Sequence, residues 1–230
     1  GERRLSAEDV HGWLFLLLTL HHLPTGLLSL PSSMSPDITI WWQRNQPAWE
    51  ACRASYADAH HRPLLDALTR LHAIVGARVE ARRELWQGIA RRPCHGNPVP
   101  AHVLRTGGRL ILVEWNGAGL GDPAMEVGRA VALSVLSGEL DTTQYVSFVA
   151  DYLAGMRDTQ DTTLEERLRV FASVLPLAVC FAVLRLLAES QLSAAERADY
   201  VAQVSRALTW IQDTLGIEVG NPRELLATLR

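Results

Sequence analysis

The segment from Pro93 to Gly121 constrains the fold of this chain most, because its composition differs from that of the sequence around it. Glycine and proline are frequent there, and two short runs are typical of strands, His102 to Arg105 and Arg109 to Trp115. Gly107-Gly108 between them suits a tight hairpin turn. The run ILVEW is apolar and ends in an acid, which predicts a buried strand that delivers a carboxylate at its end.

Most of the remaining sequence predicts helix, so the expected fold class is mainly α with one small β-hairpin. Ser6 is a good N-cap residue, and Glu8 and Asp9 suit the first turn that follows it. Residues 24–47 are rich in proline and serine and predict a loop that carries Trp41-Trp42. The expected helices span residues 6–23, 49–59, 62–74, 78–91, 124–137, 141–155, 163–189, 194–215 and 222–229.

Composition excludes several classes of protein. Hydrophobic residues make up 48% of the 230 residues and charged residues 20%, an ordinary globular balance. The net charge of −3 offers no basic surface for a nucleic-acid backbone, so no nucleic-acid partner is expected. Cys52, Cys94 and Cys180 are far apart in sequence, which argues against a disulfide framework and fits a reducing cytoplasm.

Two apolar segments resemble membrane spans. WLFLLLTL near the start is too short to cross a bilayer. Val170 to Ala188 is longer, but Pro176 interrupts it and Arg185 lies inside it. We interpret this segment as a buried core helix and expect no membrane partner, although hydropathy alone leaves a transmembrane helix open.

Residues 94–128 carry a resemblance to a known family. His95-Gly96-Asn97, then Pro100 and His102, then ILVEWNGAGLGDPAMEVG look like the aminoglycoside phosphotransferase and choline kinase family. That family's pattern is HGDxxxxN, a short hairpin, and IDWExAGxGDPxxDLA. LTLHHLP near the start also resembles a helix that the family places at the beginning of its helical lobe.

The resemblance implies phosphoryl transfer from ATP with magnesium. In such enzymes a loop aspartate accepts the substrate hydroxyl proton, an asparagine and a strand-end aspartate hold the metal, and a lysine contacts the phosphates. By position, Asn97 stands at the catalytic aspartate, His102 at the metal-binding asparagine and Glu114 at the strand-end aspartate. Asp122 is kept as the later aspartate, and His95 resembles a scaffold residue of the loop.

The departures from the family pattern affect the residues that would carry out the catalytic chemistry. Asn97 carries no charge and is no base, although its carbonyl can still orient a hydroxyl. Magnesium prefers oxygen ligands, so the imidazole of His102 is a poor replacement for an amide. Glu114 keeps the charge one methylene further out. The 230 residues contain no lysine, and the sequence before the loop is too short for the usual strand-rich lobe.

Structural interpretations stand beside these roles. Asn97 before Pro98 suits a turn, His102 suits a structural role at a strand start, and Asp122 before Pro123 suits a helix N-cap as well as a phosphate- or metal-side role. The pairs His21-His22 and His60-His61 lack carboxylates or cysteines at ligand spacing, which predicts surface or helix-end residues.

These observations together predict the helical carboxy-terminal lobe of a kinase-like fold, with the amino-terminal lobe absent. The expected parts are helices and a loop in 1–92, the catalytic-loop remnant and hairpin in 93–123, and a helical bundle in 124–230. The expected function is a cytoplasmic, pseudokinase-like binding or interaction module without cofactor, with a small molecule or a protein at its exposed face. An active phosphotransferase that uses ATP and Mg²⁺ is the alternative, and a homo-oligomer stays open.

Overall fold

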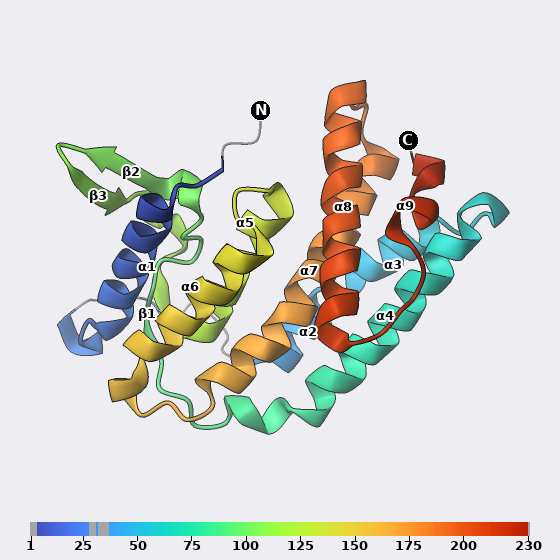
Figure 1. The fold of residues 1–230 in the computed structure, drawn as a ribbon. Coiled ribbons are helices and arrows are strands. Elements are labelled where there is room, and N and C mark those ends of the chain that lie inside the picture. Colours follow the sequence, from blue (N-terminus) through green and yellow to red (C-terminus); the bar gives the residue numbers. More distant parts are fainter. Residues whose placement is uncertain (1–3, 28–30, 32–36, 230) are drawn as a thin grey trace. The chain divides into compact units, whose positions relative to one another are not determined.

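A computed structural model describes residues 4–27, 31 and 37–229 of the chain (Figure 1). It is mainly helical and divides into two compact units. The first, here called the loop unit, comprises Gly1–Asp37 and Glu84–Phe171. The second, the helical unit, comprises Ile38–Arg83 and Ala172–Arg230. The mainly α fold class with one small hairpin is confirmed.

The helices of the loop unit begin where the sequence offers side-chain caps. Ser6 and Asp9 form a capping box at the start of α1, and Asp141 and Gln144 form another at α6. The helices are α1 (Ala7–His22), α5 (Pro123–Ser137), α6 (Thr142–Gly155) and the first part of α7 (Leu164–Glu189). Short 3-10 turns span Thr25–Leu27, Pro100–His102, Trp115–Gly117 and Arg157–Thr159. A four-residue 3-10 turn, Arg83–Trp86, leads into the unit.

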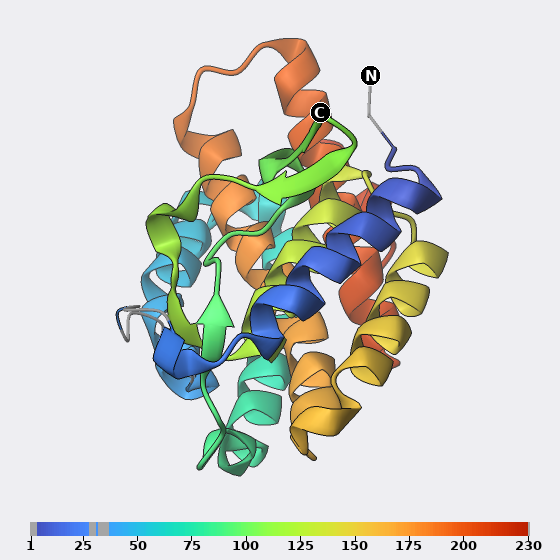
Figure 2. The ribbon, with the colours of Figure 1, turned by 90° about the vertical axis from the view of Figure 1, so that its left-hand side faces the viewer.

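The predicted hairpin is confirmed. Strands β2 (Val103–Thr106) and β3 (Arg109–Leu112) pair in antiparallel register. Gly107 and Gly108 have φ of 53° and 74°, which a glycine adopts at little cost and which matches the turn that tight hairpins favour. Helix α1 packs against β3, β1 and α6, as Figure 2 shows from the side of the hairpin.

A second strand pair was not predicted. Strands β1 (Arg92–Cys94) and β4 (Gly119–Gly121) pair antiparallel and hold the two ends of the loop segment together. Each strand is only three residues long and contains glycine or proline, so neither shows the alternation by which a strand is recognised in sequence.

The helical unit contains two departures from the expected helices. Its helices are α2 (Ile38–Arg44), α3 (Gln46–Ser55), α4 (Arg62–Ala81), the rest of α7, α8 (Ala194–Leu215) and α9 (Pro222–Leu225), with 3-10 turns at Ala59–His61 and Ala227–Leu229. The prediction that residues 24–47 form one loop was wrong for α2. The prediction of separate helices over 62–74 and 78–91 was also wrong, because α4 runs through the interval and ends at Ala81.

Tertiary contacts explain both departures. The indole of Trp42 on α2 stacks on His72 of α4 with ring centroids 5.0 Å apart. The same indole lies against Gly76, where an added Cβ would be 3.4 Å from its nitrogen. Val75 and Val79 on either side of Gly76 are buried. Burial of this face outweighs the cost of about 1 kcal/mol for a glycine inside a helix.

Helix α7 contains the apolar segment that the sequence placed at 170–188. By length and composition it is the one helix in the described part of the chain that qualifies as a candidate membrane span, with a mean hydropathy of 2.4. Within that window, 78% of the residues are buried inside the structure, a property that core helices of soluble proteins share. Pro176 lies inside the helix without ending it. The burial fits the core-helix interpretation.

Candidate functional site

The loop that follows β1 begins with a buried histidine. The His95 side chain is fully buried, and its Nε2–H donates to the backbone oxygen of Val113 at 2.7 Å. Its Nδ1 accepts from the N–H of Asn97 at 3.3 Å, and the ring of Trp115 meets it edge-on at 4.5 Å. One nitrogen therefore donates and the other accepts, which fixes a neutral tautomer. These are the contacts of a residue that ties the loop to the end of the hairpin.

Gly96 is required for two separate reasons. Its φ of 90° lies in the region that side chains rarely adopt. A Cβ at this position would also lie 2.3 Å from the backbone oxygen of Gly117. The close approach lets the Gly96 N–H donate to Oε1 of Glu126 at 2.6 Å. The glycine thus allows an acid on α5 to hold the loop backbone directly.

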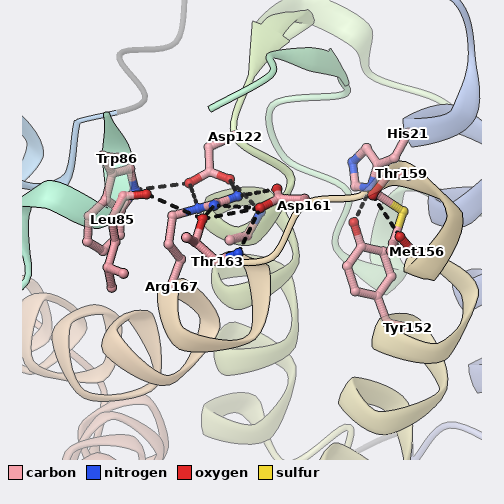
Figure 3. Close-up of polar contacts among 11 residues, drawn as sticks. His21, Leu85, Trp86, Asp122, Tyr152, Met156, Thr159, Asp161, Thr163 and Arg167 are labelled. Carbon is pink, nitrogen blue, oxygen red and sulfur yellow. Dashed lines mark hydrogen bonds and ion pairs between the residues drawn. The ribbon is translucent and has the colours of Figure 1, made fainter. Parts of the chain in front are cut away.

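Glu126 belongs to a buried hydrogen-bond network that sequence reasoning missed. Its Oε2 accepts from Nε2–H of His21 at 2.8 Å, and the Tyr152 hydroxyl bonds Nδ1 of His21 at 2.6 Å. Figure 3 shows His21 on α1 facing Tyr152 on α6. The prediction that His21 lies at a helix end was right, but the expected surface position was wrong, because its side chain is fully buried. Two features of the sequence could have indicated this network. His21 lies in the LTLHHLP stretch, and Glu126 stands at the last acid of the family's GDPxxDLA pattern.

Cys94 lies next to this network. Its sulfur, the Glu126 carboxylate and the His21 imidazole offer ligand atoms that all lie within 4.8 Å of one another. The imidazole and both carboxylate oxygens already hold hydrogen bonds. Burial, with the negative charge of Glu126, raises the pKa of the Cys94 thiol well above its usual value, so the thiol stays protonated. We interpret these three side chains as part of a hydrogen-bonded core beneath the loop.

Asn97 and His102 are joined through the loop backbone. The Asn97 carbonyl accepts from Nδ1–H of His102 at 2.8 Å and from the N–H of Val99 at 2.9 Å, a turn geometry that Asn tolerates. The next carbonyl, of Pro98, accepts from the indole N–H of Trp13 at 2.7 Å. In the described part of the chain, the Asn97 side-chain amide has no hydrogen-bond partner. The amide and Nε2 of His102 are therefore the polar groups that the loop can offer to a ligand.

Glu114 follows the hairpin in a strained conformation. Its φ of 66° and ψ of 51° are left-handed, which is uncommon for a residue with a side chain. The side chain is exposed, and Asn116 donates to its Oε2 at 3.3 Å. The predicted strand over 109–115 was too long, because β3 ends at Leu112, and it is not buried, because alternate residues along it are exposed. A strained carboxylate at such a turn is a feature that functional sites often contain.

The structure places four of the five candidate residues, His95, Asn97, His102 and Glu114, in the loop and at the end of the hairpin. His95 bonds the oxygen of Val113, and the His102 carbonyl accepts from the Val113 N–H at 2.9 Å. Glu114 is the next residue in the chain, so it adjoins both histidines and the Asn97 turn that they support.

Asp122, the fifth candidate, is buried and fully engaged. Its Oδ1 accepts from the N–H of Ala124 at 2.9 Å, which caps α5, and from Nη2 of Arg167 at 3.0 Å. Its Oδ2 accepts from the indole of Trp86 at 3.0 Å and from Nε of Arg167 at 3.1 Å. Figure 3 shows the side chains of Trp86 and Arg167 directed toward the Asp122 carboxylate. The contacts favour the N-cap role over a phosphate- or metal-side role.

Arg167 is the centre of a buried ion cluster. Its side chain is fully buried and also donates to both oxygens of Asp161, at 3.0 and 2.7 Å, and to the hydroxyl of Thr163 (Figure 3). Burial opposes ionisation of Asp161, but Arg167 and Thr163 outweigh it and hold the pKa of that carboxyl below its usual value. The cluster joins the start of α5 to the start of α7. Asp161 lies six residues from Arg167 in sequence, but Asp122 lies 45 residues away, and no sequence motif predicted the cluster.

The loop residues fit a magnesium ion poorly. Mg²⁺ in phosphotransferases is held through oxygen ligands, usually one or two carboxylates. Glu114 offers one exposed carboxylate, His102 offers a nitrogen, and both oxygens of Asp122 are occupied by Arg167, Trp86 and α5. The metal role that the resemblance implies for His102 and Glu114 therefore rests on one suitable side chain.

Comparison with known proteins agrees with the loop, hairpin and helix described above. The sequence model of the phosphotransferase enzyme family matches residues 14–171, well over half of the chain. The chain belongs to the phosphotransferase enzyme family. The match begins inside α1 and ends inside α7, so it contains His21, the loop, the hairpin and Arg167.

Individual proteins also resemble the chain over part of their length. Protein LicA from Haemophilus influenzae is 34% identical over 56 residues, which are 24% of this chain and 16% of that protein. The structure of choline kinase LicA from Streptococcus pneumoniae has a TM-score of 0.52 at 15% identity and covers 90% of this chain and 64% of that one. A putative aminoglycoside phosphotransferase from Ralstonia eutropha JMP134 has a TM-score of 0.61 at 11% identity and covers 91% and 65%.

These similarities are limited both in sequence identity and in the length that they cover. At such identities the two solved structures show the kinase-like fold alone. The chain spans less than two thirds of the length of either of them, and a smaller part of the Haemophilus protein. What the relatives' names say about choline or aminoglycosides applies to those proteins.

Proposed function

We propose that the chain is a pseudokinase-like member of its family, a module that binds a small hydroxylated molecule or a protein without transferring phosphate. The observation that carries the proposal is the contrast at the loop. His95, Gly96 and Glu126 hold its backbone firmly, while Asn97 stands where the family pattern has the catalytic aspartate. An amide orients a hydroxyl but accepts no proton from it.

A further feature supports loss of transfer. The loop offers magnesium a single exposed carboxylate, that of Glu114. Since phosphoryl transfer depends on neutralising the charge of the phosphates, a loop with fewer metal ligands supports it poorly. No step of the proposed function uses a metal or a nucleotide.

The exposed face of the hairpin supports a partner-binding role. Leu104 and Ile111 are cross-strand partners and are 49% and 43% exposed, and Trp115 beyond them is 45% exposed. Adjacent exposed apolar side chains are typical of an interaction surface. We propose that this face binds a protein. The variant Leu104→Glu with Ile111→Glu should keep its melting temperature and lose any concentration-dependent association seen by sedimentation.

An active ATP-dependent phosphotransferase is the alternative function. The observation that favours it is Glu114, whose negative charge is retained, exposed and held in a strained turn beside the loop. In that case Asn97 would position the substrate hydroxyl. The bonds of Asp122 to the start of α5 and to Arg167 support a structural role for it in either function.

Titration of the purified chain separates the two functions. Choline and an aminoglycoside serve as probes, each with and without ATP and Mg²⁺, and both heat and ADP release are measured. The proposal expects no ADP release above a protein-free control. Magnesium-dependent heat of ATP binding together with ADP release would overturn it in favour of the enzyme.

The variant Asn97→Asp tests whether only the base is missing. If the loop geometry is intact and nucleotide binds, the variant should gain turnover that the parent chain lacks. Asn116→Asp, which adds the same charge two residues beyond Glu114, is the matched control and should gain none.

A further inference from the structure

The helical unit contains a groove that the proposed function does not use. It lies between α8 and α9, both within Ala172–Arg230, and encloses about 580 Å³, a volume in the range of small-molecule sites. Its lining residues are Ala194, Arg197, Ala198, Val201, Ala202, Ser205, Arg206, Arg223 and Leu226.

The floor of this groove is apolar. Four alanine or valine side chains on successive turns of α8 face Leu226, which follows α9. Val201 and Leu226 are buried and belong to the core of the unit, so the floor is a rigid surface. Small side chains along α8 leave room for an aliphatic body of a ligand rather than for packing within the chain.

The rim of the groove is cationic. Arg197, Arg206 and Arg223 line it, and among the described residues no aspartate or glutamate does. Arg206 already has an interaction within the chain. Within the described part of the chain, the guanidinium groups of Arg197 and Arg223 form no hydrogen bond or ion pair. By contrast, the exposed arginines Arg53 and Arg185 of the same unit pair with nearby glutamates.

We propose that this groove binds a small amphipathic anion, an aliphatic chain that ends in a carboxylate. Two unpaired guanidinium groups beside an apolar floor match that chemistry, because arginine binds carboxylates through a planar fork of donors and the floor removes aliphatic surface from water. The Ser205 hydroxyl adds a further donor at the rim. A phosphate monoester on the same chain offers the same kind of headgroup, and the experiment distinguishes the two.

Calorimetric titration of the full chain with decanoate, decyl phosphate and decan-1-ol tests the proposal, with each probe kept below its micelle concentration. Decanoate should bind, and decan-1-ol should bind at least roughly tenfold more weakly, because an alcohol forms no charge-assisted bond. Tighter binding of decyl phosphate than of decanoate would reassign the headgroup to phosphate and overturn the carboxylate choice. Equal binding of the alcohol, or no binding of any probe, would overturn the proposal.

Substitutions of residues that line the groove test whether decanoate binds there. Arg197→Gln and Arg223→Gln should each weaken decanoate binding roughly tenfold, and Ala198→Trp should fill the groove and abolish it. Ala198 and Arg223 are exposed, so melting temperatures should stay near that of the parent chain. Arg53→Gln is the matched control, because Arg53 is an exposed arginine on α3 that pairs with Glu50 outside the groove. Equal weakening by Arg53→Gln would show nonspecific charge attraction and overturn the site.

Discussion

The carboxylate of Glu126 accepts a hydrogen bond of 2.6 Å from the backbone N–H of Gly96, across 30 residues of sequence. The acid is almost fully buried and its other oxygen is bonded to His21, so it fixes the loop from inside the unit. The loop backbone is therefore held by His95 and Glu126 and not by the side chain of Asn97.

Replacing Glu126 with leucine should lower the free energy of unfolding by about 2–4 kcal/mol, because the N–H of Gly96 and Nε2–H of His21 lose their acceptor while buried. Glu126→Gln should cost less, since an amide retains one acceptor and the His21 tautomer can exchange. Urea denaturation measures both. Glu165→Gln, at an exposed ion pair on α7, is the control and should change stability by less than about 0.5 kcal/mol. Equal losses for the three variants would contradict the buried network.

Replacing Gly96 with alanine should destabilise the loop unit more than the same change at Gly107. Both residues have positive φ, which costs alanine about 1–2 kcal/mol. A Cβ at Gly107 meets nothing within 4 Å, whereas one at Gly96 collides with the backbone of Gly117. The larger fall in melting temperature expected for Gly96→Ala therefore includes the clash with Gly117, and identical melting temperatures would refute the close approach.

Replacing Arg167 with methionine should cost about 3–5 kcal/mol, because Asp122 and Asp161 would lose the guanidinium that neutralises them in the buried cluster. Arg169→Met, two residues along the same helix, removes an exposed pair with Glu165 and should cost less than about 1 kcal/mol. Guanidinium chloride denaturation of the two variants makes the comparison. A loss for Arg167→Met no larger than the control's would mean that the cluster is not a stabilising element.

Two histidines should titrate on opposite sides of the usual histidine pKa of about 6.5. A hydrogen bond that the His22 ring donates to Asp158, helped by a second one to the Leu18 carbonyl, raises the pKa of His22. Burial between Trp42 and Trp49 lowers the pKa of His72. The His22 contribution to stability is therefore full below about pH 6.5 and is lost as pH rises through its folded pKa, whereas the His72 contribution is full above about pH 6.5 and is lost as pH falls through its folded pKa.

Chemical shifts of the imidazole protons, followed by NMR from pH 5 to pH 8 in roughly half-unit steps, measure both values. Asp158→Asn should bring the His22 pKa back toward its usual value and leave that of His72 unchanged. A His72 pKa above that of His22 would contradict the assignment.

Local sequence determined the elements whose geometry depends on neighbours a few residues away. Ser6 with Asp9 begins α1, and Gly107-Gly108 makes the hairpin turn, since capping and turn conformations are set by side chains and φ angles within about four residues. The loop before the hairpin and the GDP segment between the hairpin and α5 lie in one continuous stretch, so their order along the chain follows directly from the sequence. The roles of Asn97, His102 and Glu114 remain predictions.

Only the tertiary structure decided which polar groups are buried and what they bind. His21 meets Glu126 across 105 residues and Tyr152 across 131, and Arg167 meets Asp122 across 45. The contact between Trp42 and Gly76 likewise stabilises α2 and the full length of α4. Burial depends on which distant surfaces pack together, and the free energy of removing a charge or an indole from water is set there, beyond the reach of any local pattern.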